Sequence, residues 1–169
     1  MSYNKVKRTE KAHYLNTTPI TEDNKEYLFK LIGVGITDFG IDYNPQKENE
    51  KWIINDNTTT ENEGYQLSGG VEQTAYKGDP VFDYVENIAY NLDLNDKAKT
   101  QILEVYKYRY TKEEGGAIKY QARIFDCLIS ITSTDGDKAK INYDIDINGD
   151  PILGTVTFVE GAPVFTATI

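Results

Sequence analysis

The feature that most constrains this chain is its C-terminal part, from residue 100 onward, in which strand-like segments are separated only by short turns. Residues 141–147 alternate strictly, with isoleucine or tyrosine at the odd positions and asparagine or aspartate at the even positions. Such a period of two places the apolar set on one face of a sheet and the polar set on the other. The segments of this part that we expect to form strands are 100–111, 118–134, 139–148, 152–159 and 164–168.

Turn residues separate these segments. Asn148–Gly149 is the strongest short hairpin signal in the chain, because both residues tolerate the positive φ angles of a type I′ turn. We therefore expect residues 139–148 and 152–159 to pair through a turn at that point. Residues 113–116, 134–138 and 160–161 mark further turns, and 118–134 is long enough for one bent strand or two.

One segment, residues 79–92, carries a clear helix signal. Asp79 suits the N-cap, since its carboxylate can accept hydrogen bonds from the free N–H groups of the first turn. Pro80 suits the first helical position, where its missing N–H costs nothing. Apolar residues then recur at spacings of three and four, which gives one stripe for burial: Val81, Phe82, Val85, Ile88, Ala89 and Leu92.

The N-terminal part predicts an arm, a first strand and one long loop. Residues 1–25 are polar and lack periodicity, so we expect an extended arm. Residues 27–37 form an apolar run typical of a core strand. Residues 44–64 are mostly polar and predict a long loop or hairpin with an exposed tip, a kind of segment that usually serves function or partner contact. Shorter strand candidates are 39–43, 52–55 and 65–77, the last with a bulge at Gly69–Gly70.

Together these elements predict a mainly β fold with one flanking α-helix. Strands, then a helix, then further antiparallel strands favour either a two-sheet β-sandwich or a rolled barrel, with the helix over one open face or edge. The 169 residues fit one domain, residues 26–169, preceded by the arm of residues 1–25. No apolar run approaches the length needed to span a membrane.

The charge of the chain is unevenly distributed. Five basic and three acidic residues give residues 1–25 a charge of +2, so the remainder carries −11 of the total of −9. This balance argues against a protein that grips nucleic acid, which must neutralise phosphates with Lys and Arg. The basic segment is either a solvated tail or an arm that helps copies of the acidic chain attract one another.

A search for catalytic or metal-binding residues finds little. His13, the only histidine, lies in the polar arm, where we expect no packed partner to orient it as a general base. Cys127 lies in an apolar run and is expected to be a buried thiol. Asp144 to Gly149 matches the first half of a calcium-binding EF-hand loop, but position twelve is Thr155 where that loop needs glutamate, and no helices flank it. We therefore expect no cofactor, no metal and no enzymatic activity.

Three segments, in this order, resemble the major tail tube proteins of long-tailed bacteriophages of Gram-positive bacteria. Phe29 to Ile36 is similar to the first strand of those proteins. Gly78-Asp79-Pro80-Val81-Phe82-Asp83-Tyr84 resembles their GDPxxDF segment, with Tyr84 where the family pattern has phenylalanine. Ile141 to Gly154 resembles their final hairpin. The resemblance covers residues 27–160.

This resemblance implies a structural subunit of the tail of a virion or of a phage-tail-like particle, assembled in the host cytoplasm. Six subunits would form a ring, and stacked rings would enclose a tape-measure protein and later pass double-stranded DNA, which an acidic lumen would repel. The partners would be other copies of the chain and other tail proteins. The arm and the 44–64 loop would make the contacts between subunits, with these candidate residues: Lys7, Arg8, Lys11, Tyr14, Trp52 and Ile53.

Other functions remain open. A monomeric β-sandwich that binds a carbohydrate or a receptor would also explain the tyrosines and an exposed Trp52, because aromatic rings stack on sugars. Trp52 could instead fold back onto the core of its own chain. A hydrolase with two paired carboxylates is a third possibility, since the chain holds 27 acidic residues and some pair must lie close in space.

Overall fold

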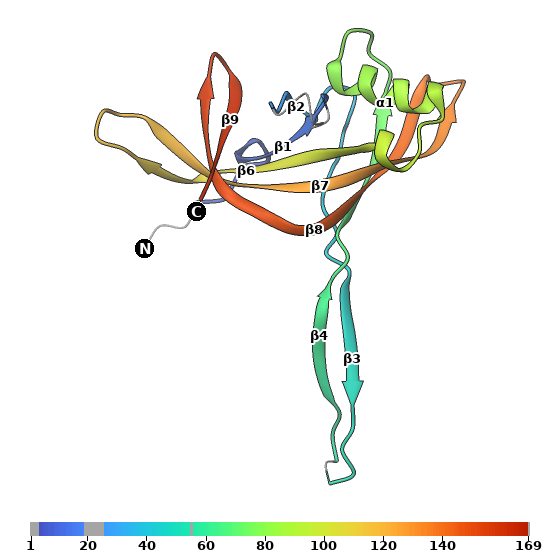
Figure 1. Cartoon of the computed structure of the whole chain (residues 1–169), viewed down its shortest axis with the longest axis vertical. Coiled ribbons are helices and arrows are strands. Elements are labelled where there is room, and N and C mark those ends of the chain that lie inside the picture. Colours follow the sequence, from blue (N-terminus) through green and yellow to red (C-terminus); the bar gives the residue numbers. More distant parts are fainter. Residues whose placement is uncertain (1–3, 19–25, 55, 169) are drawn as a thin grey trace.

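The computed structural model describes residues 4–18, 26–54 and 56–168 and consists mainly of β-strands with one α-helix (Figure 1). The strands are β1 (Lys11–Asn16), β2 (Phe29–Leu31), β3 (Pro45–Glu50), β4 (Thr59–Tyr65), β5 (Ser68–Thr74), β6 (Lys99–Lys112), β7 (Ile118–Asp135), β8 (Lys140–Val159) and β9 (Ala162–Ala167). The helix α1 spans Pro80–Asn91, and two short 3-10 turns are η1 (Arg8–Glu10) and η2 (Asn95–Lys97). In the described ranges, no helix combines the length and apolar character needed to cross a membrane.

Seven strands form one antiparallel sheet in the order β2-β1-β6-β7-β8-β5, with β9 added beside β8. Figure 1 shows this sheet curled into a trough, with α1 across its open side at one end. The remaining strands, β3 and β4, form a separate hairpin that projects away from the trough. The mainly β fold with a flanking helix is therefore confirmed, and of the two predicted architectures the chain adopts the rolled, nearly closed one.

The curled sheet buries side chains on both of its faces. Ile102 and Leu103 are neighbours in β6, and neither is exposed to solvent, yet they belong to two different apolar clusters. The larger cluster lies under α1, and the smaller one lies on the opposite face, around Tyr14 and Val105. Central strands such as β1 and β6 consequently have no solvent-facing side over much of their length.

The helix begins and ends as the sequence predicts. The Asp79 carboxylate accepts a hydrogen bond of 2.9 Å from the Phe82 N–H, and Pro80 is the first helical residue. Val85 and Ile88 on the apolar stripe are buried against the sheet. Leu92 was predicted to belong to the buried stripe, which is wrong: it ends the helix in the left-handed conformation, with a φ of 52°, and is 81% exposed.

The predicted hairpin at Asn148–Gly149 is wrong. β8 runs through this dipeptide as one strand of 20 residues, and β7 pairs with it on both sides of the dipeptide. The pairing shifts between Ile124↔Ile152 and Asp126↔Asn148, so residues 149–151 bulge opposite a single residue of β7. Gly149, with a φ of 68°, supplies the left-handed backbone for this bulge. The long partner strand thus overrides a strong local turn signal.

The predicted bulge at Gly69–Gly70 is also wrong. Both glycines pair in unbroken register with β8, opposite Ile145 and Asp144. A Cβ on Gly69 would lie 2.8 Å from the carbonyl oxygen of Gly40 and equally close to the Phe39 ring. The absent side chain at position 69 therefore lets the segment before β3 approach β5.

The arm predicted for residues 1–25 does not extend through residues 11–16. These residues form β1, which pairs with β2 on one edge and with β6 on the other. In contrast, most of the apolar run 27–37 is not a strand: Phe29–Leu31 forms β2, the chain then turns, and Ile36 adds only an isolated bridge to Gln73. Residues 39–43 contribute only the isolated bridge Asp42↔Ser68. The other described part of the arm is residues 4–10 and 17–18, and its remainder lies outside the described residues.

Candidate functional site

The β3–β4 hairpin is the most exposed part of the molecule. Its register runs from Pro45↔Tyr65 to Glu50↔Thr59, and its side chains lie almost entirely in solvent. The short strand predicted at 52–55 is not formed by its described residues: Trp52, Ile53 and Ile54 lie at the tip, where they are 63%, 103% and 86% exposed, and residue 55 lies outside the described residues. Trp52 therefore does not fold back onto the core of its own chain. Three large apolar side chains at the end of a projecting hairpin mark an interaction surface.

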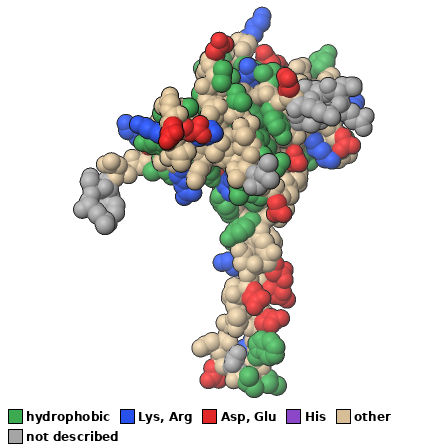
Figure 2. Space-filling view, turned by 60° about the vertical axis from the view of Figure 1, so that its left-hand side comes forward, with side chains coloured by type: hydrophobic (Ala, Val, Ile, Leu, Met, Phe, Trp, Pro, Cys, Tyr) green, Lys and Arg blue, Asp and Glu red, His purple; other side chains and the backbone are tan. Residues whose placement is uncertain are grey.

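The hairpin carries acidic residues along its strands and apolar residues at its end. Residues 45–65 contain five acidic residues and two lysines, a net charge of −3: Glu48, Glu50, Asp56, Glu61 and Glu63 against Lys47 and Lys51. Figure 2 shows the acidic side chains along one side of the hairpin and the hydrophobic ones at its end. A partner surface should therefore offer an apolar patch bordered by positive charge.

Polar contacts fix the base of the hairpin to the sheet. The rings of Tyr43 and Tyr65 meet edge to face, with centroids 5.7 Å apart. The Asn44 side chain donates to the Gln66 carbonyl at 3.0 Å and to the Ser68 hydroxyl at 3.2 Å. The Tyr43 hydroxyl accepts a hydrogen bond of 2.7 Å from the Arg123 guanidinium. Arg123 thereby links the base of the hairpin to the middle of the sheet.

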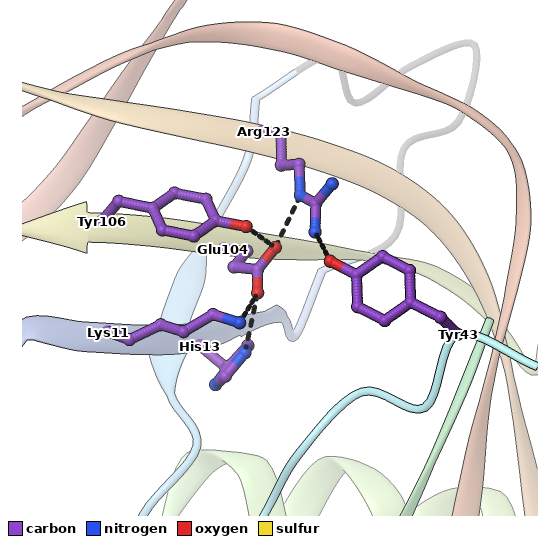
Figure 3. Close-up of polar contacts among 6 residues, drawn as sticks. All are labelled: Lys11, His13, Tyr43, Glu104, Tyr106 and Arg123. Carbon is purple, nitrogen blue, oxygen red and sulfur yellow. Dashed lines mark hydrogen bonds and ion pairs between the residues drawn. The ribbon is translucent and has the colours of Figure 1, made fainter. Parts of the chain in front are cut away.

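Arg123 belongs to a cluster around Glu104, whose carboxylate is fully buried (Figure 3). Strand register places His13, Glu104 and Arg123 directly opposite one another on β1, β6 and β7. Arg123 Nε and the Tyr106 hydroxyl each donate to Glu104 Oε2 at 2.6 Å. Lys11 Nζ lies 2.6 Å from Oε1, and His13 Nε2 lies 3.4 Å from the same oxygen.

These contacts change the ionisation of the cluster. Burial by itself would raise the pKa of Glu104, but the hydrogen bonds from His13, Lys11, Tyr106 and Arg123 outweigh burial and hold that pKa well below the ordinary glutamate value of 4.5. Burial and the bond to the carboxylate raise the pKa of Tyr106. Burial would lower the pKa of Arg123, but its bonds to Tyr43 and Glu104 raise it.

The cluster is suited to hold structure together rather than to move protons. A carboxylate offers about four acceptor positions, and four side chains of the chain itself already occupy Glu104. Glu104 lies between buried Leu103 and Val105, and this charge inside an apolar run is the one sequence signal that could have revealed the cluster. His13 was expected to lack a packed partner, which is wrong: it is buried and meets the Phe39 ring edge to face.

The predicted contact residues differ in exposure: four are exposed, one is paired within the chain and one is buried. Of the exposed residues, Trp52 and Ile53 lie at the hairpin tip, Lys7 lies just before η1 and Arg8 lies in η1. Lys11 is committed to Glu104. Tyr14 does not reach the surface, because its ring is buried in the smaller apolar cluster, so it is not available for a contact between subunits.

The other residues considered for chemistry have structural positions. Cys127 is buried under α1, and burial raises the pKa of its thiol. Asp144 and Asp146 lie within β8, where the Asp146 carboxylate accepts a hydrogen bond of 2.9 Å from the Ser130 hydroxyl. In the part of the chain that the structure describes, no three His, Cys, Asp or Glu side chains are grouped so that they could hold a metal ion.

Comparison with known proteins gives one kind of match. The sequence matches no protein-family model and no curated protein sequence. Among solved structures, the chain is similar to a chain in the cryo-EM structure of the anti-feeding prophage baseplate, six-fold symmetrised. The two chains share 9% sequence identity with a TM-score of 0.45, and the match covers 90% of this chain and 97% of the other.

Proposed function

We propose that this chain is a structural, non-enzymatic subunit of the tail of a bacteriophage or of a phage-tail-like particle, and more specifically of its tail tube. The observation that carries the proposal is the β3–β4 hairpin, which exposes Trp52, Ile53 and Ile54 to solvent. A two-stranded hairpin alone in water is at best marginally stable. Burial of its apolar end against another subunit would stabilise both the hairpin and an assembly.

The main sheet also supports assembly. Its hydrogen-bonded order starts with β2 and stops with β5, whose outer edge carries only the isolated bridges to Ile36 and Asp42, so the described strands do not close the trough into a barrel. Open strand edges tend to pair with other chains. Sheets joined across subunits would form a continuous wall around a lumen, as the resemblance of residues 27–160 to tail tube proteins implies.

In this proposal six subunits form each ring, and the rings stack around a tape-measure protein in the virion tail after assembly in the host cytoplasm. The total charge of −9 then gains a role, because an acidic wall repels phosphates and lets double-stranded DNA pass without sticking. Other tail proteins are the remaining partners, and no membrane is involved.

Electron microscopy of the purified chain tests the proposal. We expect six-membered rings or tubes as the concentration rises. The double variant Trp52→Ser with Ile53→Ser should remain dispersed, whereas Tyr90→Ser, which alters an even more exposed aromatic on α1, should assemble normally. Compact monomers of the unaltered chain at high concentration would overturn the proposal.

The exposure of Trp52 favours a second candidate, a monomeric module that binds a carbohydrate by ring stacking. A glycan array separates the two candidates. Binding of a glycan by a chain that stays monomeric, and loss of that binding in Trp52→Ser, would support the module. Assembly without glycan binding would support the tail subunit.

A further inference from the structure

A groove runs along the edge of β1 that β2 leaves uncovered. β2 pairs only with residues 14–16 of β1, so no strand of the described residues lies beside Lys11 and Ala12 on that edge. The groove has a volume of about 620 Å³. Its lining combines apolar side chains with cations: Leu31, Ile32 and Phe39, together with Arg8, Lys107 and Lys11, the last of which is paired with Glu104.

Part of the groove lining is open to solvent. Leu31, which lines the groove, is 53% exposed. The groove therefore combines apolar side chains with positive charge on an otherwise acidic protein. These are the properties that the acidic, apolar-tipped hairpin requires of a partner.

We propose that this groove receives the tip of the β3–β4 hairpin from a second copy of the chain. Ile53 and its neighbours would cover the apolar side chains of the groove, while Glu48 and Glu50 would face Arg8 and Lys107. Figure 1 shows the hairpin directed away from β1 and β2, so the groove cannot accept the hairpin of its own chain. The inference rests on the proposed function and names the surface through which subunits join.

The geometry of this contact has a consequence for assembly. The tip and the groove are different surfaces, so the contact is heterologous: each chain has one tip to give and one groove to fill. Such contacts propagate from copy to copy and form either a closed ring or an open filament. Two-fold dimers joined tip to tip are therefore not expected.

Cross-linking locates the contact directly. Full-length chains with Ile53→Cys are mixed with chains carrying Leu31→Cys and oxidised under assembly conditions; the native Cys127 is buried and present in every sample. We expect at least about tenfold more cross-linked dimer than in a control mixture of Ile53→Cys with Tyr90→Cys. Cross-linking of Ile53→Cys chains only to one another, or equally to Tyr90→Cys chains, would overturn the inference. If the unaltered chain does not assemble at all, the proposed function is overturned. If the unaltered chain assembles but Ile53→Cys and Leu31→Cys do not cross-link, only the inference about the groove is overturned.

A charge exchange provides an independent test. The pair Glu48→Lys and Glu50→Lys, and separately the pair Arg8→Glu and Lys107→Glu, should each raise the concentration needed for assembly by about tenfold, because like charges would then face each other. Lys11 is left unchanged because it supports Glu104. Mixing the two kinds of chain or combining all four changes should restore assembly to within about threefold of the unaltered chain. Additive losses without rescue would contradict the contact.

Discussion

The hairpin and the centre of the sheet are opposite in character. In β3 and β4, apolar side chains lie in water at the tip and charges line an exposed ribbon. In β1, β6 and β7, a carboxylate with no exposure to solvent lies between apolar clusters. A buried charge must be paired by the chain itself, whereas an exposed apolar tip is satisfied only by another molecule. The centre of the sheet thus stabilises the subunit, and the hairpin presents the apolar surface that in our proposal joins subunits.

The largest expected effect comes from removing the buried charge. Glu104→Gln should lower the free energy of unfolding by about 3–5 kcal/mol, because Lys11 and Arg123 lose their common partner. Chemical denaturation monitored by circular dichroism measures the loss. The matched control Glu48→Gln removes a carboxylate from the exposed hairpin and should change stability by less than about 0.5 kcal/mol. Equal effects of the two substitutions would erase the contrast between the regions.

Lowering the pH should gradually remove the contribution of ionised Glu104 to the free energy of unfolding. The pKa of Glu104 is lower in the folded than in the unfolded chain, so its contribution to stability is fully present above pH 4.5 and is lost as the pH falls toward the folded value. The stability difference between the unaltered chain and Glu104→Gln should therefore narrow below pH 4.5, by at most about 1.4 kcal/mol per pH unit. Denaturation curves at a series of pH values measure it. A constant difference down to pH 2.5 would show that Glu104 is not held ionised by its neighbours.

A smaller effect is expected at the link between the two regions. Tyr43→Phe removes the hydroxyl that accepts from Arg123 and should cost about 1 kcal/mol. Amide hydrogen exchange in β3 and β4 should consequently become about fivefold faster, while exchange in β6 and β7 stays close to normal. Tyr110→Phe, which alters another exposed tyrosine, is the control. Unchanged exchange in the hairpin would mean that this bond does not hold its base.

The smallest effect on stability is expected at the hairpin tip. Trp52→Ser with Ile53→Ser should change the free energy of unfolding by less than about 0.5 kcal/mol, because neither side chain contributes to the core of its own chain. The same variant should fail to assemble, as sedimentation velocity can show. A large loss of stability would indicate that the tip packs within its own subunit in solution.

Local sequence signals predicted the parts of the fold that depend on local interactions. Three such features depend mainly on residues close by in the sequence: the Asp79–Pro80 start of α1, the apolar stripe that follows it and the alternation of residues 141–147. The turn predicted at Asn148–Gly149 was wrong because the conformation there depends on β7, which is long enough to pair with β8 on both sides of this dipeptide. β1 was missed because its polar residues find their partners far away in sequence: His13 and Glu104 are 91 positions apart.

The same reasoning explains what could be predicted of the candidate site. Trp52 and Ile53 stand in a polar segment, which predicted an exposed hairpin tip but left open whether Trp52 folds back onto the core of its own chain. The cluster around Glu104 depends on the registers of β1, β6 and β7 and on the path of the segment carrying Tyr43. A charge inside an apolar strand signals that some partner exists, but only the assembled sheet identifies it.

In the proposed assembly, the bonds at the base of the hairpin would also set the angular precision of the particle. Six residues of extended chain span about 20 Å, so the hairpin acts as a lever with Tyr43 near its fulcrum. A rotation of about 10° at the base would displace the tip by roughly 3–4 Å over that length, close to one residue of a strand. An error of this size would move the tip from one side chain of a receiving subunit to the next. The buried carboxylate, which never contacts a neighbour, would in this way control how accurately neighbours are placed.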